Sequence, residues 1–191
     1  SAITLDFTEK TIDAAALEKL LDGVMLDIAP LNLVPGKDAM AAMQPVLDLF
    51  DKRDLAGDAV GFLNLDPLAA SAQYGDSGAV DHAALAALAE ARPGLRLMTS
   101  SGAAYHAMGA SVPQELGWMV AGLVAYVRAL EAAGMDAADA VSKITLTVAA
   151  DVDFFATLAK TRAARLLFAN IAEAIGAENV RPQIHAETSL R

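Results

Sequence analysis

The sequence predicts an α/β protein in which short apolar strands alternate with longer amphipathic helices. Two observations support this fold class. The strand candidates are nearly continuous apolar runs, which is typical of a parallel sheet buried on both faces. Most of them precede a stretch whose apolar residues recur at helical spacing, as in repeated βα units. Because 191 residues can bury a substantial core, we expect a single domain over residues 1–191.

Six segments carry the strand pattern, and they are residues 2–7, 23–28, 60–65, 95–100, 144–148 and 182–187. The pattern does not distinguish an open doubly wound sheet from a barrel, since both have the same order of elements. Neither a Gly-x-Gly-x-x-Gly turn nor a Walker loop occurs, so the usual reason to prefer a nucleotide-binding open sheet is missing. Six strands are fewer than the eight that close a barrel. A barrel built from this chain would therefore be incomplete.

The helices are predicted from apolar periodicity and from residues that start or stop a helix. The first two cover residues 12–22 and 83–91, and Pro93-Gly94 closes the second. A long helix is expected from Pro113 to about Ala133, because proline suits a first turn and glycine follows. The last helix is expected from Asp151 or Asp153 to Gly176.

Composition excludes several classes of function. The net charge is −10 and the basic residues are scattered, so no basic stripe is available for nucleic acid. The chain has no cysteine, which excludes disulfides, thiolate nucleophiles and zinc–thiolate sites. No apolar run approaches a membrane span, and the start SAITLDFTEKT does not have the pattern of a secretion leader. We expect a cytoplasmic protein with no membrane partner.

The three histidines are the first candidates for chemistry. His106 stands next to Tyr105 after a strand end, where α/β proteins place their sites. The pair is either functional or packed at the mouth of a βα loop. His185 and Glu187 share one face of the last strand, and we favour a satisfied polar pair over a metal site. His82 is expected to be a solvated turn residue.

Other charged and aromatic residues have more ordinary explanations. Lys160, Arg162 and Arg165 form a small basic set on the last helix, for which a solvated face is the favoured interpretation over an acidic partner or a phosphate. Four aromatic residues at helical spacing predict core or interface packing, and they are Trp118, Tyr126, Phe154 and Phe155.

Five longer motifs together resemble the acyl-CoA-binding barrel of the adenosylcobalamin-dependent methylmalonyl-CoA mutases. They are VPQELGWMVAGLVAYVRAL (112–130), DFFATLAKTRAARLLF (153–168), HAETS (185–189), LDGVMLDIAPLNL (21–33) and GFLNLDPLA (61–69). The resemblance spans nearly all 191 residues. It implies part of a (β/α)8 TIM-type barrel with about six βα units, in which the first strand and the last part are missing.

The resemblance also implies that the family's catalytic pair is absent. Catalytic chains of the family carry Ser-Gly-Tyr-His after a strand, whereas residues 101–104 read Ser-Gly-Ala-Ala. The family's tyrosine, which orders the radical reaction, falls on Ala103, and its histidine, which donates to the substrate thioester carbonyl, falls on Ala104. Alanine can do neither. Tyr105 and His106 come two positions later, and no catalytic residue is expected in this chain.

Further positions depart from the family in the same direction. The substrate-facing glutamine becomes Asn64, the arginine that grips the substrate carboxylate falls on Tyr74, and the glutamine near the chain end becomes Glu187. A shortened amide, a lost cation and an added anion should each weaken acyl-group binding. His185 is kept, and Lys143 replaces an arginine that contacts coenzyme A. The possible vestigial substrate or coenzyme A contacts are Asn64, Tyr105, His106, Lys143, His185 and Glu187.

The implied function is that of a small, structural subunit of a heterodimeric methylmalonyl-CoA mutase. A catalytic large subunit would bind adenosylcobalamin and interconvert methylmalonyl-CoA and succinyl-CoA. The family's Asp-x-His-x-x-Gly cobalamin motif is absent from the sequence, so we expect no cofactor and no metal on this chain. The alternatives are an active mutase of altered specificity that uses Tyr105-His106, a non-enzymatic acyl-CoA-binding module, and a barrel of an unrelated aldolase-like enzyme.

Overall fold

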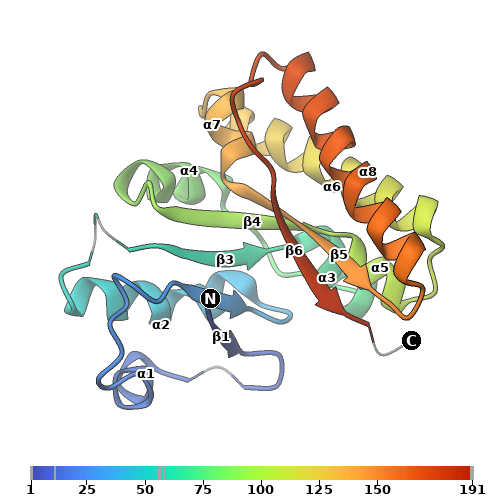
Figure 1. The fold of residues 1–191 in the computed structure, drawn as a ribbon. Coiled ribbons are helices and arrows are strands. Elements are labelled where there is room, and N and C mark those ends of the chain that lie inside the picture. Colours follow the sequence, from blue (N-terminus) through green and yellow to red (C-terminus); the bar gives the residue numbers. More distant parts are fainter. Residues whose placement is uncertain (1, 11, 56, 58, 190–191) are drawn as a thin grey trace. The chain divides into compact units, whose positions relative to one another are not determined.

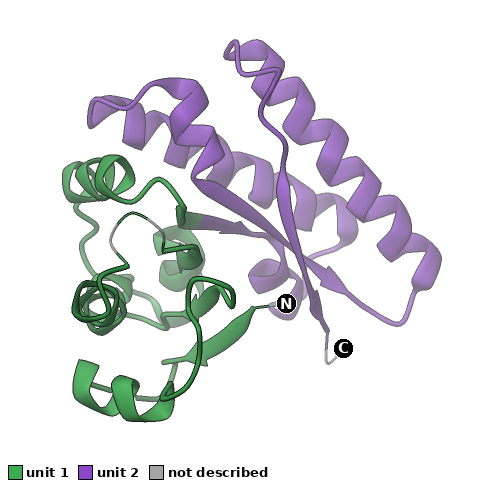
Figure 2. Cartoon of the chain, turned by 60° about the vertical axis from the view of Figure 1, so that its left-hand side comes forward, with its two compact units in different colours: residues 1–98 green, residues 99–191 purple. Residues whose placement is uncertain are grey.

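The computed structural model describes residues 2–10, 12–55, 57 and 59–189. The chain divides into two compact units, residues 1–98 and residues 99–191 (Figure 2). Strands and helices alternate along both units (Figure 1), which confirms the α/β class. In the part of the chain that is described, no helix combines the length and the apolarity needed to cross a bilayer.

The first unit holds parallel strands in the order of the sequence. The strands are β1 (Ile3–Asp6), β2 (Leu31–Val34), β3 (Gly61–Leu65) and the first residues of β4 (Leu95–Ser101), and the helices are α1 (Ala14–Leu20), α2 (Ala39–Lys52), α3 (Pro67–Tyr74) and α4 (His82–Ala91). Buried and half-buried side chains alternate along β2 and β3, so one face of each strand is packed and the other is not. Leu33, Leu63 and Phe50 are among the buried side chains.

The second unit places two long helices against its strands. It contains the last residues of β4, then α5 (Gly102–Ala107), α6 (Val112–Ala132), α7 (Ala137–Ser142), β5 (Ile144–Ala150), α8 (Phe154–Ala174) and β6 (Gln183–Thr188). β5 and β6 are parallel, from Thr145 opposite Gln183 to Ala150 opposite Thr188. The Thr99 hydroxyl donates to the Thr145 carbonyl at 3.1 Å, so the end of β4 lies beside β5. α6 and α8 contact each other and β5.

Aspartate starts six of the helices. In each case the carboxylate accepts a hydrogen bond from a backbone N–H two or three residues further on, and the six residues are Asp13, Asp38, Asp66, Asp81, Asp136 and Asp153. Such a cap satisfies an N–H that has no partner inside the helix, and the negative charge suits the positive end of the helix dipole. Six of the acidic residues in this chain therefore act as N-caps that stabilise the first turns of helices.

One predicted strand is wrong. Residues 23–28 form turns, in which Ile28 and Ala29 both donate to the Met25 carbonyl, and β2 begins only at Leu31. The Arg53 guanidinium binds the start of this segment, donating to the carbonyls of Leu21 and Val24, each at 2.9 Å. The other five strands lie at the predicted places within one or two residues. The helices α2, α3, α5 and α7 were not predicted.

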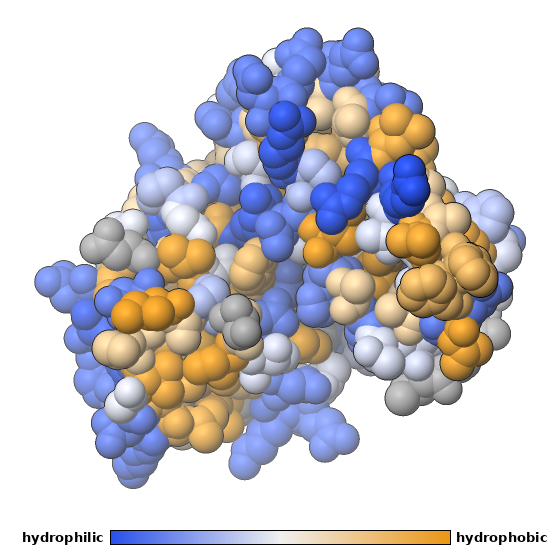
Figure 3. All heavy atoms as spheres, in the orientation of Figure 1, coloured by the Kyte–Doolittle hydropathy of each residue, from blue (hydrophilic) through white to orange (hydrophobic). Residues whose placement is uncertain are grey.

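The prediction that four aromatic residues pack in the core or at an interface is only partly confirmed. Tyr126 is buried in the core, whereas Trp118, Phe154 and Phe155 are exposed over 55%, 69% and 79% of their surface. The last two lie with Val152 and Leu158 in an apolar patch at the start of α8 (Figure 3).

His82 is the first residue of α4 and half-buried rather than a solvated turn residue.

A buried ion pair joins three elements of the second unit, and it corrects the expectation that Lys160 belongs to a solvated face. Lys160 Nζ on α8 donates to Glu115 Oε2 on α6 at 2.8 Å, and both side chains are fully buried. Glu115 Oε1 accepts the backbone N–H of Ala149 in β5 at 2.8 Å. Arg162 and Arg165, the other members of the basic set, are exposed. Thus α6, α8 and β5 meet at one carboxylate.

We predict that Gly94→Ala destabilises the protein by about 1–3 kcal/mol, the usual cost of overpacking. A Cβ at Gly94 would lie 2.5 Å from the backbone oxygen of Ala59, which has no flexible end that can move aside. Gly117→Ala is the matched control, because a Cβ there meets nothing within 4 Å and alanine favours the helix interior. Urea unfolding of both variants checks this, and equal effects would contradict it.

We predict that Lys160→Met costs about 3–5 kcal/mol of unfolding free energy, because it leaves the Glu115 carboxylate buried without its cation. The double variant Glu115→Gln/Lys160→Met should recover part of the loss, since the amide oxygen still accepts the Ala149 N–H without a charge. Arg162→Met on the exposed face of α8 serves as the control. Chemical denaturation measures all three, and a Lys160→Met loss no larger than that of the control would refute a stabilising pair.

Candidate functional site

A polar cluster lies where the strands of the second unit end. Ser101 ends β4 and caps α5 by accepting the N–H of Ala104. Asp151 follows β5, and Ser189 follows β6, where its N–H donates to the carbonyl of Ala150 at 2.8 Å. Parallel α/β folds place their functional groups at this end of the strands, so this cluster is the candidate site.

His106 joins this cluster to the buried ion pair. Its Nε2 lies 2.9 Å from Ser189 Oγ, and its Nδ1 lies 3.5 Å from Glu115 Oε2. Lys160 Nζ, besides binding Glu115, is 3.7 Å from Asp151 Oδ2. The cluster therefore brings the carboxylates of Glu115 and Asp151 close to the Lys160 ammonium and the His106 imidazole. The His106 ring is held by contacts within the second unit.

Asp151 stays ionised in this setting. Burial opposes its charge, but the Asp153 N–H, the Thr157 hydroxyl and the electrostatic interactions with Lys160 and His106 together outweigh that effect and lower the pKa of Asp151 below its ordinary value of 3.8. A carboxylate with a lowered pKa is an anchor for cations and N–H groups. It is poorly suited to act as a general acid near neutral pH.

Tyr105 is held by an aromatic neighbour. Its ring stacks on Trp118 of α6, with ring centroids 5.1 Å apart and an angle of 12° between the planes. Such stacking adds about 0.5–1.5 kcal/mol to the burial of the rings. Tyr105 and His106 thus lie next to each other in sequence, but each makes its own contacts.

Ala103 and Ala104, which the resemblance predicts at the places of the family's tyrosine and histidine, lie in the first turn of α5, where Ala103 is buried. The turn is closely packed: a Cβ at Gly102 would lie 2.8 Å from Glu115 Cγ and 3.2 Å from the carbonyl oxygen of Thr147. Because α5 is a helix, a shift of two positions turns a side chain by about 200° around the axis. Tyr105 is therefore turned about 160° away from Ala103, and His106 as far from Ala104, whereas His106 lies three residues after Ala103 and shares its side of the helix.

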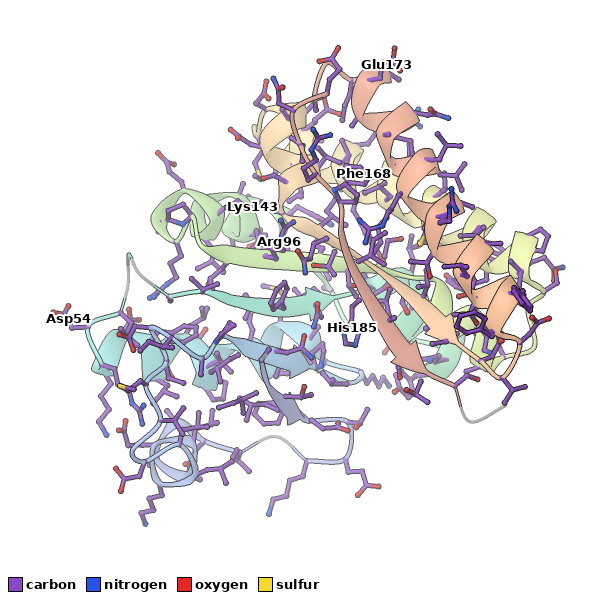
Figure 4. All side chains as sticks on the ribbon, in the orientation of Figure 1. Asp54, Arg96, Lys143, Phe168, Glu173 and His185 are labelled. Carbon is purple, nitrogen blue, oxygen red and sulfur yellow. The ribbon has the colours of Figure 1, made fainter. Side chains whose placement is uncertain are left out.

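Three of the predicted contact residues lie on β6 or just before β5, at different positions along these strands. His185 and Glu187 are exposed on the same face of β6, opposite Thr147 and Ala149. Lys143 is half-buried and stands before the first residue of β5. Lys143 is six residues from Ala149, which corresponds to about 20 Å of strand, so Lys143 and Glu187 lie toward opposite ends of β5. Figure 4 labels Lys143 and His185.

Asn64 and Tyr74 belong to the first unit. Asn64 has a left-handed backbone, with φ of 52°, and its amide donates to Asn32 Oδ1 and to the Leu33 carbonyl, both at 2.8 Å. The amide therefore bonds to the neighbouring strand. Tyr74 ends α3 and is about half exposed. Sequence reasoning singled out both residues, but it did not predict the partners of Asn64.

Sequence reasoning did not single out Glu115 and placed Lys160 on a solvated face, although a signal for the burial of both residues exists. Glu115 precedes the buried Met119 and Leu123 at intervals of four, and Lys160 precedes the buried Ala164 and Phe168 in the same way. A charged residue in register with the apolar stripe of a helix indicates a buried charge, and two such helices with opposite charges indicate a pair. Among the described residues, no three histidine or carboxylate side chains are arranged to hold a metal.

Comparison with known proteins identifies the family. The sequence pattern of the methylmalonyl-CoA mutase family matches residues 13–190. A methylmalonyl-CoA mutase small subunit of Streptomyces virginiae is 41% identical over 93% of the chain. A probable small subunit of Mycobacterium bovis is 38% identical over all of it, and a small subunit of Propionibacterium freudenreichii is 32% identical over 85%.

The chain spans only part of these relatives, 30%, 32% and 26% of their respective lengths. The match nevertheless covers both units and the whole polar cluster, from the helix start at Asp13 to Ser189. On this evidence the chain belongs to the methylmalonyl-CoA mutase family.

Proposed function

We propose that the chain is part of the small, non-catalytic subunit of a heterodimeric methylmalonyl-CoA mutase. Its role is to support a catalytic large subunit that interconverts methylmalonyl-CoA and succinyl-CoA. The names of the relatives support the small-subunit assignment. A cytoplasmic location, first expected from the sequence, is part of the same proposal.

The observation that carries the non-catalytic role is the pair of alanines in the first turn of α5. Ala103 and Ala104 offer only methyl groups at the positions aligned with the family's tyrosine and histidine. Tyr105 is turned about 160° away from Ala103 and stacks on Trp118, whereas the His106 ring, on the same side of α5 as Ala103, is engaged by Ser189. Neither ring replaces the absent pair in this arrangement.

We infer that the two units together form part of a (β/α)8 barrel within a single domain. The parallel order of β1 to β4 in the first unit and the parallel pair β5–β6 in the second support this. About six of the eight βα units of such a barrel are present.

Adenosylcobalamin, which the family implies, supplies a carbon radical by cleavage of its cobalt–carbon bond. The residues of this chain do not fit a role in holding it. None of the three histidines stands in an Asp-x-His-x-x-Gly sequence, and the His106 ring contacts Ser189 and Glu115. We assign the cofactor to the large subunit.

Any remaining contact with an acyl-CoA is proposed to be weak. The Asn64 amide bonds to the neighbouring strand, Tyr74 carries no charge for a substrate carboxylate, and Glu187 adds negative charge beside His185 on β6. Lys143 remains as a cation before β5. These residues are better described as vestiges of a site than as a working one.

We expect the untruncated protein to purify as a one-to-one complex with a larger chain that carries cobalamin. Native mass spectrometry of gently purified material, taken from cells that produce both chains, measures the stoichiometry. The protein purified alone should show neither turnover of methylmalonyl-CoA with added adenosylcobalamin nor binding of coenzyme A. A solitary chain with turnover would support the altered-mutase alternative, and one that only binds coenzyme A would support the binding-module alternative.

Substitutions at the Tyr-His pair should leave the chemistry of the complex intact. Tyr105→Phe keeps the stack on Trp118 but removes the hydroxyl, and His106→Gln keeps a side chain that can hydrogen bond to Ser189. We predict a kcat of the assembled complex within about twofold of the wild type for both variants. A loss of about 10²–10⁴, typical of a missing acid or base, in complexes of wild-type stoichiometry would show instead that the pair is catalytic.

A further inference from the structure

The exposed side of α8 combines large apolar side chains with arginines. Phe155, Leu158 and Leu166 are exposed over 79%, 48% and 64% of their surface. Because each residue turns the helix by about 100°, these three side chains share one band of about 120° with three further exposed residues between positions 155 and 166. We call this band the outer face of α8, and its residues are Phe155, Leu158, Ala159, Arg162, Arg165 and Leu166.

The opposite side of α8 packs within the second unit. Its buried residues are Lys160, Ala164, Phe168 and Ala172, and the helix contacts α6 and β5 (Figure 1). One side of α8 therefore holds the unit together, and the other presents apolar side chains to solvent. Exposed apolar patches of this kind mark sites of protein–protein contact. Aromatic residues and arginine, both present on the outer face, are enriched at such contacts.

The two arginines of the outer face have no acidic neighbour on the helix. Arg162 and Arg165 are three residues apart, so they are helical neighbours of like charge. Asp153, which caps α8, comes nine residues before Arg162, and Glu173 comes eight residues after Arg165. Within the described part of the chain, neither arginine takes part in an ion pair. The outer face is thus positive in a chain that has 24 acidic and 14 basic residues.

This combination specifies the charge of a partner. A surface that covers Leu158 and Leu166 also removes water from the guanidinium groups of Arg162 and Arg165, which is costly unless an opposite charge replaces the water. Carboxylates on the partner supply that charge, and the planar guanidinium suits bidentate binding of a carboxylate. The outer face therefore matches a surface on which acidic side chains are flanked by apolar ones.

We propose that the outer face of α8 binds a helix of the large mutase subunit. The contacting side of that helix carries acidic side chains opposite Arg162 and Arg165 and apolar side chains opposite Phe155, Leu158 and Leu166. A helix suits this face, which extends about 17 Å, or three turns, along α8. This proposal rests on the proposed function, which supplies the partner. A second copy fits less well, because its outer face brings two more arginines and no carboxylate, and a net charge of −10 opposes self-association.

The test is binding of the purified large mutase subunit to the full-length small subunit, measured by biolayer interferometry at several salt concentrations. Arg162→Glu/Arg165→Glu should weaken binding at least about tenfold and reduce its salt dependence. Phe155→Ser/Leu166→Ser, which removes apolar contacts without changing charge, should weaken binding and leave its salt dependence as in the wild type.

The matched control is Arg128→Glu/Arg181→Glu, which makes the same change of net charge at two exposed arginines outside the outer face. This variant should bind the large subunit within about twofold of the wild type, because the charge of the contact itself is unchanged. Circular dichroism and thermal melts confirm that each variant is folded.

A crosslink identifies what covers the outer face. Ala159 lies in the middle of this face, and residues 1–191 contain no cysteine, so Ala159→Cys supplies a thiol for a photoactivatable crosslinker. Mass spectrometry of the crosslinked complex should find a helix of the large subunit that carries acidic residues. A crosslink to the small subunit itself, within one chain or between two copies, would overturn the proposal.

The outcomes separate this proposal from the function on which it rests. If the wild type binds the large subunit and the folded outer-face variants bind equally well, the outer-face proposal is overturned and the proposed function stands. A wild-type protein that does not bind the large subunit at all would overturn both.

Discussion

The packing of the second unit depends on the buried carboxylate of Glu115, which needs partners wherever α6 and α8 cover it. Glu115 is fully buried, and its two oxygens are taken by the Lys160 ammonium and the Ala149 N–H. A buried charge without a partner costs far more than an exposed one, so any arrangement that separates α6 from α8 exposes the molecule to that cost. The pair therefore fixes the register of two helices against β5. It also places the contacts of His106 and Asp151, which surround it.

This constraint ties the start of α5 to the buried carboxylate. The close contact of Gly102 with Glu115 and Thr147 requires α5 to begin where it does, whatever side chains follow. The two alanines after Gly102 fit this packing. Of the two rings that follow, Tyr105 stacks on Trp118, whereas His106, on the same side of α5 as Ala103, contacts Ser189. Packing around Glu115 thus fixes the position of Ala103 and Ala104 on the scaffold.

The sequence predicted the fold class because buried parallel strands are continuous apolar runs, and five of six were placed by that property alone. The run at residues 23–28 has the same composition, but the guanidinium of Arg53, distant in sequence, holds the neighbouring carbonyls in turns. The site was harder to predict. His106 and Ser189 are 83 residues apart, and charged residues such as Lys160 are ordinarily exposed. Only the register of Glu115 and Lys160 with the apolar stripes of α6 and α8 indicates that these two charges are buried.

The distribution of charge has a consequence for recognition. Six aspartates are bound to helix starts, so much of the acidic excess is already hydrogen-bonded to backbone N–H groups. Several basic side chains are likewise paired with carboxylates. A partner surface can distinguish one face of such a protein from another only where charges remain unpaired beside apolar surface.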